Sequence, residues 1–129
     1  MLLGLISFVN LAYGQGKFKE FMTETPPEER AQLQTDYMKE TLSLSRDQES
    51  KVHGVNLKYA EKTQEAYEAP TKKNQKLKTM KHMNAQKEGE LKLILSTEQY
   101  DTYERNKEAM KEKIKARIEE KKEEEKYKP

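Results

Sequence analysis

One five-residue pattern, Leu-Ser-x-x-Gln, occurs twice in the chain, first from Leu44 to Gln48 and again from Leu95 to Gln99. A serine just before a helix accepts a hydrogen bond from the N–H of the third helical residue, and a glutamine at that third position bonds back to the serine N–H. The pattern therefore predicts helices that begin after Ser45 and after Ser96. We expect both serines to cap helices and not to act as nucleophiles.

The composition limits how these helices can pack. Hydrophobic residues make up 33% of the 129 residues, charged residues make up 37%, and there is no Trp. Such a chain cannot build a thick core, so we expect one domain of long amphipathic helices that each bury a narrow stripe. Burial against a second copy of the chain is then expected, because one copy leaves apolar surface uncovered.

Hydrophobic residues recur every three or four positions through most of the chain, which is the spacing of helices that bury one side. Pro70 interrupts this spacing and marks the turn of a long helical hairpin. We therefore predict an all-α fold with about four helices. The predicted segments are a flexible leader over 15–24, helices over 25–41, 45–68, 71–94 and 96–118, and a charged, fraying tail over 119–129. In the last helix, Glu and Lys three residues apart, such as Glu119 and Lys122, are expected to pair.

The first fourteen residues differ from the rest, because they carry no charge and are mostly apolar. Small residues at Ala12 and Gly14 fit the site that a signal peptidase reads, although the usual positive residues at the start are missing. We predict a signal peptide over 1–14 that is cleaved before Gln15, and an exported protein with no stable membrane insertion, since the apolar run is too short to span a bilayer. Without Cys, the protein has no disulfide and no lipid-modified cysteine.

Catalytic and nucleic-acid-binding patterns are absent from the sequence. There is no glycine-rich phosphate loop, no metalloprotease motif and no thiol, so we expect neither an enzyme nor a cofactor. The net charge of +2 argues against nucleic acid as a partner.

One segment is strongly basic. Between Ala69 and Lys87 the chain has six lysines and no acidic residue. A cationic helix side next to flexible Met and Leu side chains can hold partly unfolded chains loosely. Periodicity alone favours the alternative of a solvated lysine side above an ordinary core stripe. The candidate residues for binding polypeptides are Lys72, Lys73, Lys76, Leu77, Met80, Lys81 and Met83.

A metal site is a weaker alternative in the same segment. Met80, His82 and Met83, with His53 across the hairpin, offer thioether and imidazole ligands of the kind that copper prefers. Packing explains the two methionines equally well, and the neighbouring lysines repel cations. We therefore expect no metal.

Taken with the stretch from Thr25 to Ala31, the paired motifs resemble the LTxxQ motif pair and lead-in helix of the Spy/CpxP family, with Ser in place of Thr in both motifs. The resemblance covers residues 25–118. It implies a helical hairpin with flanking helices, paired antiparallel into a thin dimer, in a periplasmic, ATP-independent chaperone that binds unfolded or misfolded envelope proteins. Regulation of a stress-sensor kinase, or metal sensing, are the alternatives within that fold. The Arg-rich middle of many members is replaced here by residues 67–73.

Overall fold

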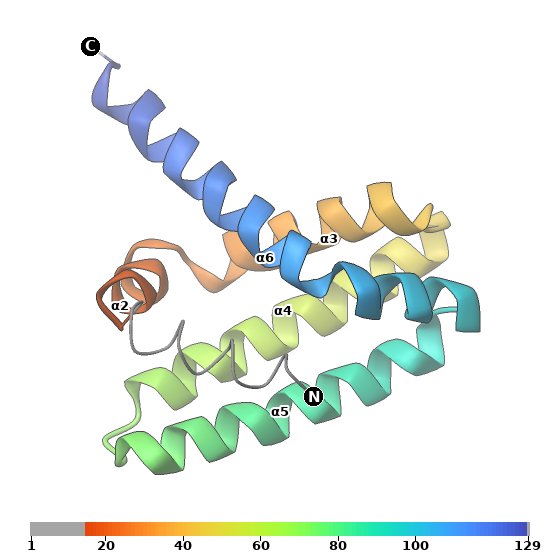
Figure 1. The fold of residues 1–129 in the computed structure, drawn as a ribbon, viewed down its shortest axis with the longest axis horizontal. Coiled ribbons are helices and arrows are strands. Elements are labelled where there is room, and N and C mark those ends of the chain that lie inside the picture. The colour runs from red at the N-terminus through yellow and green to blue at the C-terminus, as the bar shows by residue number, and fades with distance from the viewer. Residues whose placement is uncertain (1–14, 129) are drawn as a thin grey trace.

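The computed structural model describes residues 15–128, which form five helices and contain no strand (Figure 1). The all-helical fold is thus confirmed for this range. The signal peptide predicted over 1–14 lies outside the described residues. The helices are α2 (Gln15–Glu24), α3 (Pro27–Leu42), α4 (Arg46–Glu68), α5 (Lys73–Ile94) and α6 (Thr97–Lys126).

Both predicted helix starts are confirmed by complete capping boxes. The hydroxyl of Ser45 accepts from the N–H of Gln48 at 3.1 Å, and the Gln48 side chain accepts from the N–H of Ser45 at 3.1 Å. The same two bonds join Ser96 and Gln99 at 3.1 and 2.9 Å. The repeated sequence therefore builds the same local structure twice.

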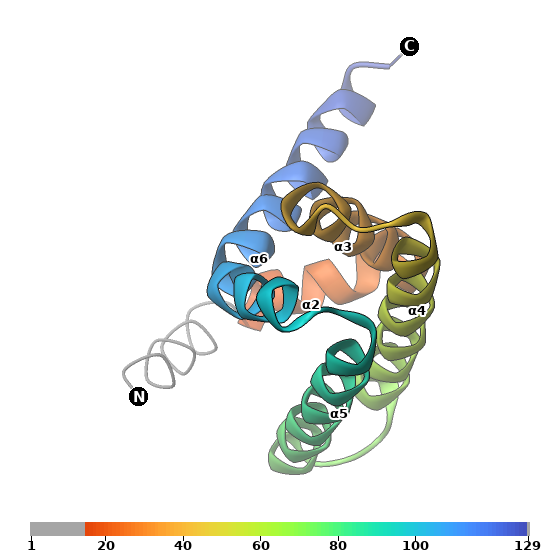
Figure 2. The same ribbon diagram turned by 90° about the vertical axis from the view of Figure 1, so that its right-hand side faces the viewer.

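The helices are arranged as a folded-over series. Helix α4 packs against α3 on one side and against α5 on the other, and α6 returns to pack on α3. Figure 2 shows α5 beside α4 and well separated from most of α6. The long hairpin of α4 and α5 with flanking helices agrees with the predicted arrangement.

The core is one continuous row of side chains, and its members come from every helix from α3 to α6. The two motif leucines, Leu44 and Leu95, belong to it. The predicted stripe is confirmed at most positions, but Leu77 and Met80 on α5 are only partly buried. The buried members are Met38, Leu42, Leu44, Val52, Val55, Tyr59, Met83, Leu91, Leu95, Tyr103, Met110, Ile114 and Ile118.

The prediction of a flexible leader over 15–24 is corrected by the structure, because these residues form helix α2. Met22 on this helix is buried, and Phe21 lies under the guanidinium of Arg30, whose carbon is 5.6 Å from the ring centre. Lys122 of α6 pairs with Glu20 at 2.9 Å and with Glu24 at 2.6 Å. Two carboxylates four residues apart thus fix α2 to a helix about one hundred residues later in the chain.

The prediction of a fraying tail over 119–129 is also corrected. Helix α6 continues to Lys126, and the predicted pair of Glu119 with Lys122 does not form, because Lys122 turns to α2. Lys121 pairs with Glu29 of α3 at 3.0 Å. The end of α6 is therefore held by contacts with two other helices, which no local pattern predicts. Among residues 15–128, no helix has an apolar stretch that could cross a bilayer.

Candidate functional site

The glutamines of the two motifs bond to each other. Nε2 of Gln48 donates to Oε1 of Gln99 at 2.7 Å, and Nε2 of Gln99 donates to Oε1 of Gln48 at 3.1 Å. We call this reciprocal pair the glutamine clasp. It joins the beginnings of α4 and α6, which lie 51 residues apart in the chain.

Each glutamine also donates a hydrogen bond to the last residue of the helix that precedes the other motif. Nε2 of Gln48 donates to the carbonyl of Ile94, the last residue of α5, at 3.2 Å. Nε2 of Gln99 donates to the carbonyl of Leu42, the last residue of α3, at 3.2 Å. The last carbonyls of a helix have no partner within the helix, so each glutamine supplies a missing donor. The clasp is thus a symmetric structural joint between two helix corners.

An open basin of about 600 Å³ lies beside the clasp. Its walls are the end of α3, the Ser43 turn and the beginning of α6, and they are mainly polar. Gln48 and Gln99 both form part of the wall, but their amide groups are already bonded. The lining residues are Thr41, Leu42, Ser43, Gln48, Ser96, Glu98, Gln99 and Thr102.

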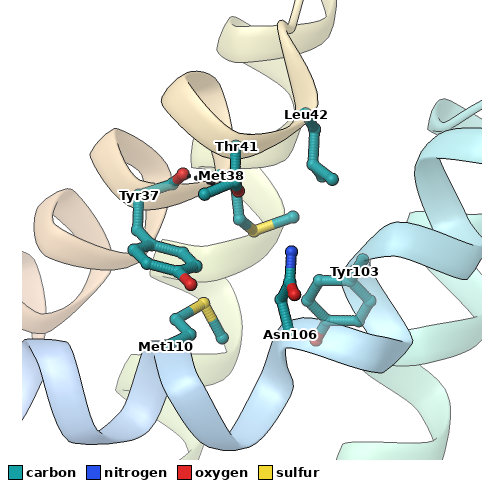
Figure 3. A pocket seen from close by; sticks show the side chains of 7 residues that line it. All are labelled: Tyr37, Met38, Thr41, Leu42, Tyr103, Asn106 and Met110. Atoms are coloured by element: carbon teal, nitrogen blue, oxygen red, sulfur yellow. Dashed lines mark hydrogen bonds between the residues drawn. The ribbon is translucent and has the colours of Figure 1, made fainter.

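The crevice between α3 and α6 is filled by side chains (Figure 3). Tyr37 and Met38 of α3 face α6 across it, and Asn106 lies between Met110 and Tyr103 along α6. No room for a water molecule remains. This contact is part of the core and does not form a ligand pocket.

The basic segment predicted from the sequence does not form a single surface. Lys72, Lys73 and Lys81 are exposed, but Lys76 is partly buried and donates to the carbonyl of Tyr67 at 2.6 Å. Within residues 15–128, the three exposed lysines make no ion pair, and the same holds for exposed Lys78. The first half of α5 therefore presents free positive charge to solvent.

The three apolar candidates on α5 divide between surface and core. Met83 is buried in the core row, whereas Leu77 and Met80 are partly buried and lie nearer to the hairpin turn. Met83 is thus a packing residue. Only Leu77 and Met80 combine apolar surface with access from solvent, next to the free lysines.

The four candidate metal ligands are not brought together. Nδ1 of His53 lies 3.1 Å from Oγ1 of Thr35 on α3, while His82 is exposed and Met83 is buried. Residues 15–128 also contain no cluster of three or more His, Cys, Asp or Glu that could hold a metal ion.

Sequence reasoning missed a buried polar network between α3 and α4. Asn56 donates to Oγ1 of Thr35 at 3.0 Å, and this hydroxyl donates to the carbonyl of Ala31 at 2.8 Å. Nδ1 of His53 lies 3.1 Å from the same hydroxyl oxygen. The network fixes the register of α3 against α4.

A buried arginine was also missed. Arg30 is 4% exposed and has no carboxylate partner within residues 15–128. Its guanidinium donates to the carbonyls of Thr25 and Ala60 and to the side-chain oxygen of Gln64, the last at 2.8 Å. Burial lowers its pKa. Three neutral oxygens therefore replace water around this cation.

A charged cluster joins α4 to α5. Hydrogen bonds from Lys58 and Tyr59 lower the pKa of Glu90, and the bond to Glu90 together with burial raises the pKa of Tyr59 to about 12. On α6, burial raises the pKa of Tyr100 to about 12. Neither tyrosine ionises near neutral pH, so these groups stabilise the helix contacts and are not poised for proton transfer.

Comparison with known proteins gives one match. A family model described as a domain of unknown function, DUF4890, matches residues 15–103, which extend from the start of α2 into the first turns of α6 and include both motifs. No curated protein and no solved structure gives a significant match. Since the model covers more than half of the chain, this protein belongs to the DUF4890 family.

Proposed function

We propose that this DUF4890 protein is an ATP-independent chaperone-like protein that binds unfolded or misfolded polypeptides and suppresses their aggregation. The observation that carries the proposal is the free charge of α5. Lys72, Lys73, Lys78 and Lys81 have no acidic partner within residues 15–128, and they flank the partly exposed side chains of Leu77 and Met80. Exposed cations attract acidic segments of a chain, and flexible apolar side chains adapt to many sequences.

The similarity of the motif pair to the Spy/CpxP family supports the same proposal, and with it a location in the periplasm after removal of residues 1–14. Regulation of a stress-sensor kinase is the alternative within this proposal. A chaperone suppresses aggregation of unrelated proteins, whereas a regulator binds one specific folded partner and leaves aggregation unchanged.

An aggregation assay tests the proposal. Denatured lysozyme with reduced disulfides is diluted into buffer without nucleotide, and light scattering is followed with and without the protein. Replacing Lys73, Lys78 and Lys81 with Gln should slow capture, because charge accelerates encounter. Salt at 0.15 M should have the same effect on the unchanged protein, since exposed charges are then screened beyond about 8 Å.

The matched control removes the same number of charges outside the proposed surface, through Gln at Lys51, Lys115 and Lys126, which are all more than half exposed. For the apolar contribution, Leu77→Ala and Met80→Ala should speed release, whereas Leu93→Ala should not, because Leu93 is 88% exposed but lies outside the proposed surface. Full suppression by all variants, with helicity unchanged, would move the binding surface elsewhere. No suppression by the unchanged protein would refute the chaperone proposal.

A further inference from the structure

Lys87 occupies an unusual position for a lysine. It follows Met83 by four residues and precedes Leu91 by four, so it lies on the same side of α5 as these two buried side chains. It is partly buried itself, and its Nζ donates to Oε1 of Gln34 on α3, at 2.9 Å. A cation therefore stands where the periodicity of α5 places an apolar residue.

This cation has no acidic partner within residues 15–128. Gln34 is its one hydrogen-bond partner there, and the charges that act on it most strongly are those of Lys107 and Lys111 on α6. Burial and these two lysines lower the pKa of Lys87 to about 8. The neighbouring acids are already engaged, since Glu88 and Glu104 both pair with Lys107.

Hydrogen-bond donors are in excess at this position. An ammonium group has three donors, and Lys87 uses one of them on Gln34. Nε2 of Gln34 adds two further donors, which make no hydrogen bond within the described part of the chain. The contrast with Arg30 is informative, because three oxygens surround that buried guanidinium. Around Lys87, by contrast, the described residues supply one acceptor for the three donors of the ammonium group.

We propose that Lys87 and Gln34 form a binding site for one carboxylate group between α3, α5 and α6. A carboxylate offers two oxygens and one negative charge, so it can accept from both side chains and neutralise the ammonium. It can come from a small free acid or from an Asp or Glu of a bound polypeptide. The site does not rest on the proposed chaperone function, since a free acid would occupy it in the absence of any client.

The test measures thermal unfolding in sodium acetate and in sodium chloride at equal ionic strength. A ligand that binds only the folded state raises the melting temperature and saturates. We expect a saturable excess of acetate over chloride in the unchanged protein and in the control Lys115→Met, whose lysine is 64% exposed and lies outside both proposed sites. The excess should be lost in Lys87→Met, where an apolar chain replaces the amine among Met83 and Leu91.

A second variant guards against loss of the fold. Gln34→Glu places a carboxylate on Lys87 within the chain, so it should raise the melting temperature in chloride and abolish the acetate excess. To identify a chain-borne acid, calorimetry compares a short leucine-rich peptide that contains one Glu with its Gln counterpart. If the Glu peptide binds more tightly than the Gln peptide, if this difference depends on Lys87 and if acetate has no effect, the site binds a carboxylate only as part of a polypeptide. An acetate effect that persists in Lys87→Met, or no preference for either form of carboxylate, would overturn the site.

Discussion

A glutamine side chain has two N–H donors and one oxygen that can accept twice, and Gln48 and Gln99 use all of them. Each oxygen accepts from its own capping serine and from the other glutamine, and each NH₂ group donates to the other glutamine and to the end of a helix. Capping alone needs only the acceptor. Glutamate would satisfy that requirement equally well, so the donors account for the choice of glutamine.

Gln48→Glu separates these two roles. The carboxylate keeps the bond from the N–H of Ser45 but cannot donate to Ile94 or Gln99, and it faces their oxygens. We expect the free energy of unfolding at pH 7 to fall by about 1–3 kcal/mol, the usual cost of an unsatisfied buried partner. Urea titration measures the change, with Gln86→Glu on the exposed side of α5 as the control. A loss below about 0.5 kcal/mol, typical of surface substitutions, would reduce the clasp to ordinary capping.

Lys87 gives the stability a defined pH dependence. Burial and the two nearby lysines lower its pKa to about 8 in the folded protein, from the ordinary value of 10.5 in the unfolded chain. Between these values the unfolded chain binds more protons, so the free energy of unfolding should rise as the pH increases from 8 towards 10. The rise should disappear in Lys87→Met. Urea titrations at several pH values test this, and a flat profile in the unchanged protein would contradict the folded-state pKa.

At the scale of single residues, the sequence predicts local bonds and misses distant ones. Ser45 and Ser96 could be identified as caps because their partners lie three residues away. The bond between Gln48 and Gln99 depends on where two corners meet in space. Lys87 and the two bonds from Arg30 to α4 were overlooked for the same reason, since these acceptors belong to other helices.

Among the helices, α2 and the end of α6 depend on each other. Lys122 pairs with Glu20 and Glu24, and these bonds raise its pKa. Lys126, only four residues later, pairs with Glu123 of its own helix. The two lysines therefore provide a matched comparison between an inter-helix contact and a local contact.

We expect Lys122→Ala to loosen α2 without unfolding the other helices. Trypsin should then cut after Lys19 faster than in the unchanged protein, because a detached helix exposes its backbone. Lys126→Ala should leave this rate unchanged. Mass spectrometry of the early fragments gives the answer, and equal cleavage in both variants would mean that Met22 and Phe21 alone hold α2.

Helix boundaries were the most predictable property of the elements. Ser45 marks the start of α4, Pro70 marks the turn between α4 and α5, and Ser96 marks the start of α6. All three are local signals in the sequence. The sequence predicts a flexible leader in place of α2 and a fraying end of α6, because no local pattern reveals the contact between the two segments. Pairing between the two segments supplies the stabilising contacts that neither segment contains alone.

The open shape of the whole molecule follows from its composition. A narrow stripe on each helix buries one row of side chains, and Figure 2 shows that α5 and α6 remain apart along most of their length. This shape was predictable in outline, because few apolar residues cannot fill a closed bundle. The side on which the bundle stays open was not predictable, since it depends on which helices meet in space.

We predict that two copies associate. Residues 15–129 should sediment at equilibrium with twice the mass of one chain at micromolar concentration, because a narrow apolar stripe on each helix leaves apolar surface that one copy cannot cover. A cooperative single chain at all concentrations would refute the dimer.

The glutamine clasp also has a consequence for the order in which the chain folds. The corner between α3 and α4 contains only neighbouring residues and can form as soon as both helices exist. Gln48 can form its bonds to Gln99 and Ile94 only after α5 and the start of α6 are in place. Formation of the glutamine clasp therefore closes a loop of 51 residues in a single step. A chain interrupted before Gln99 would form the corner between α3 and α4. It would lack the donor for the carbonyl of Leu42, so the last carbonyl of α3 would have lost this hydrogen bond.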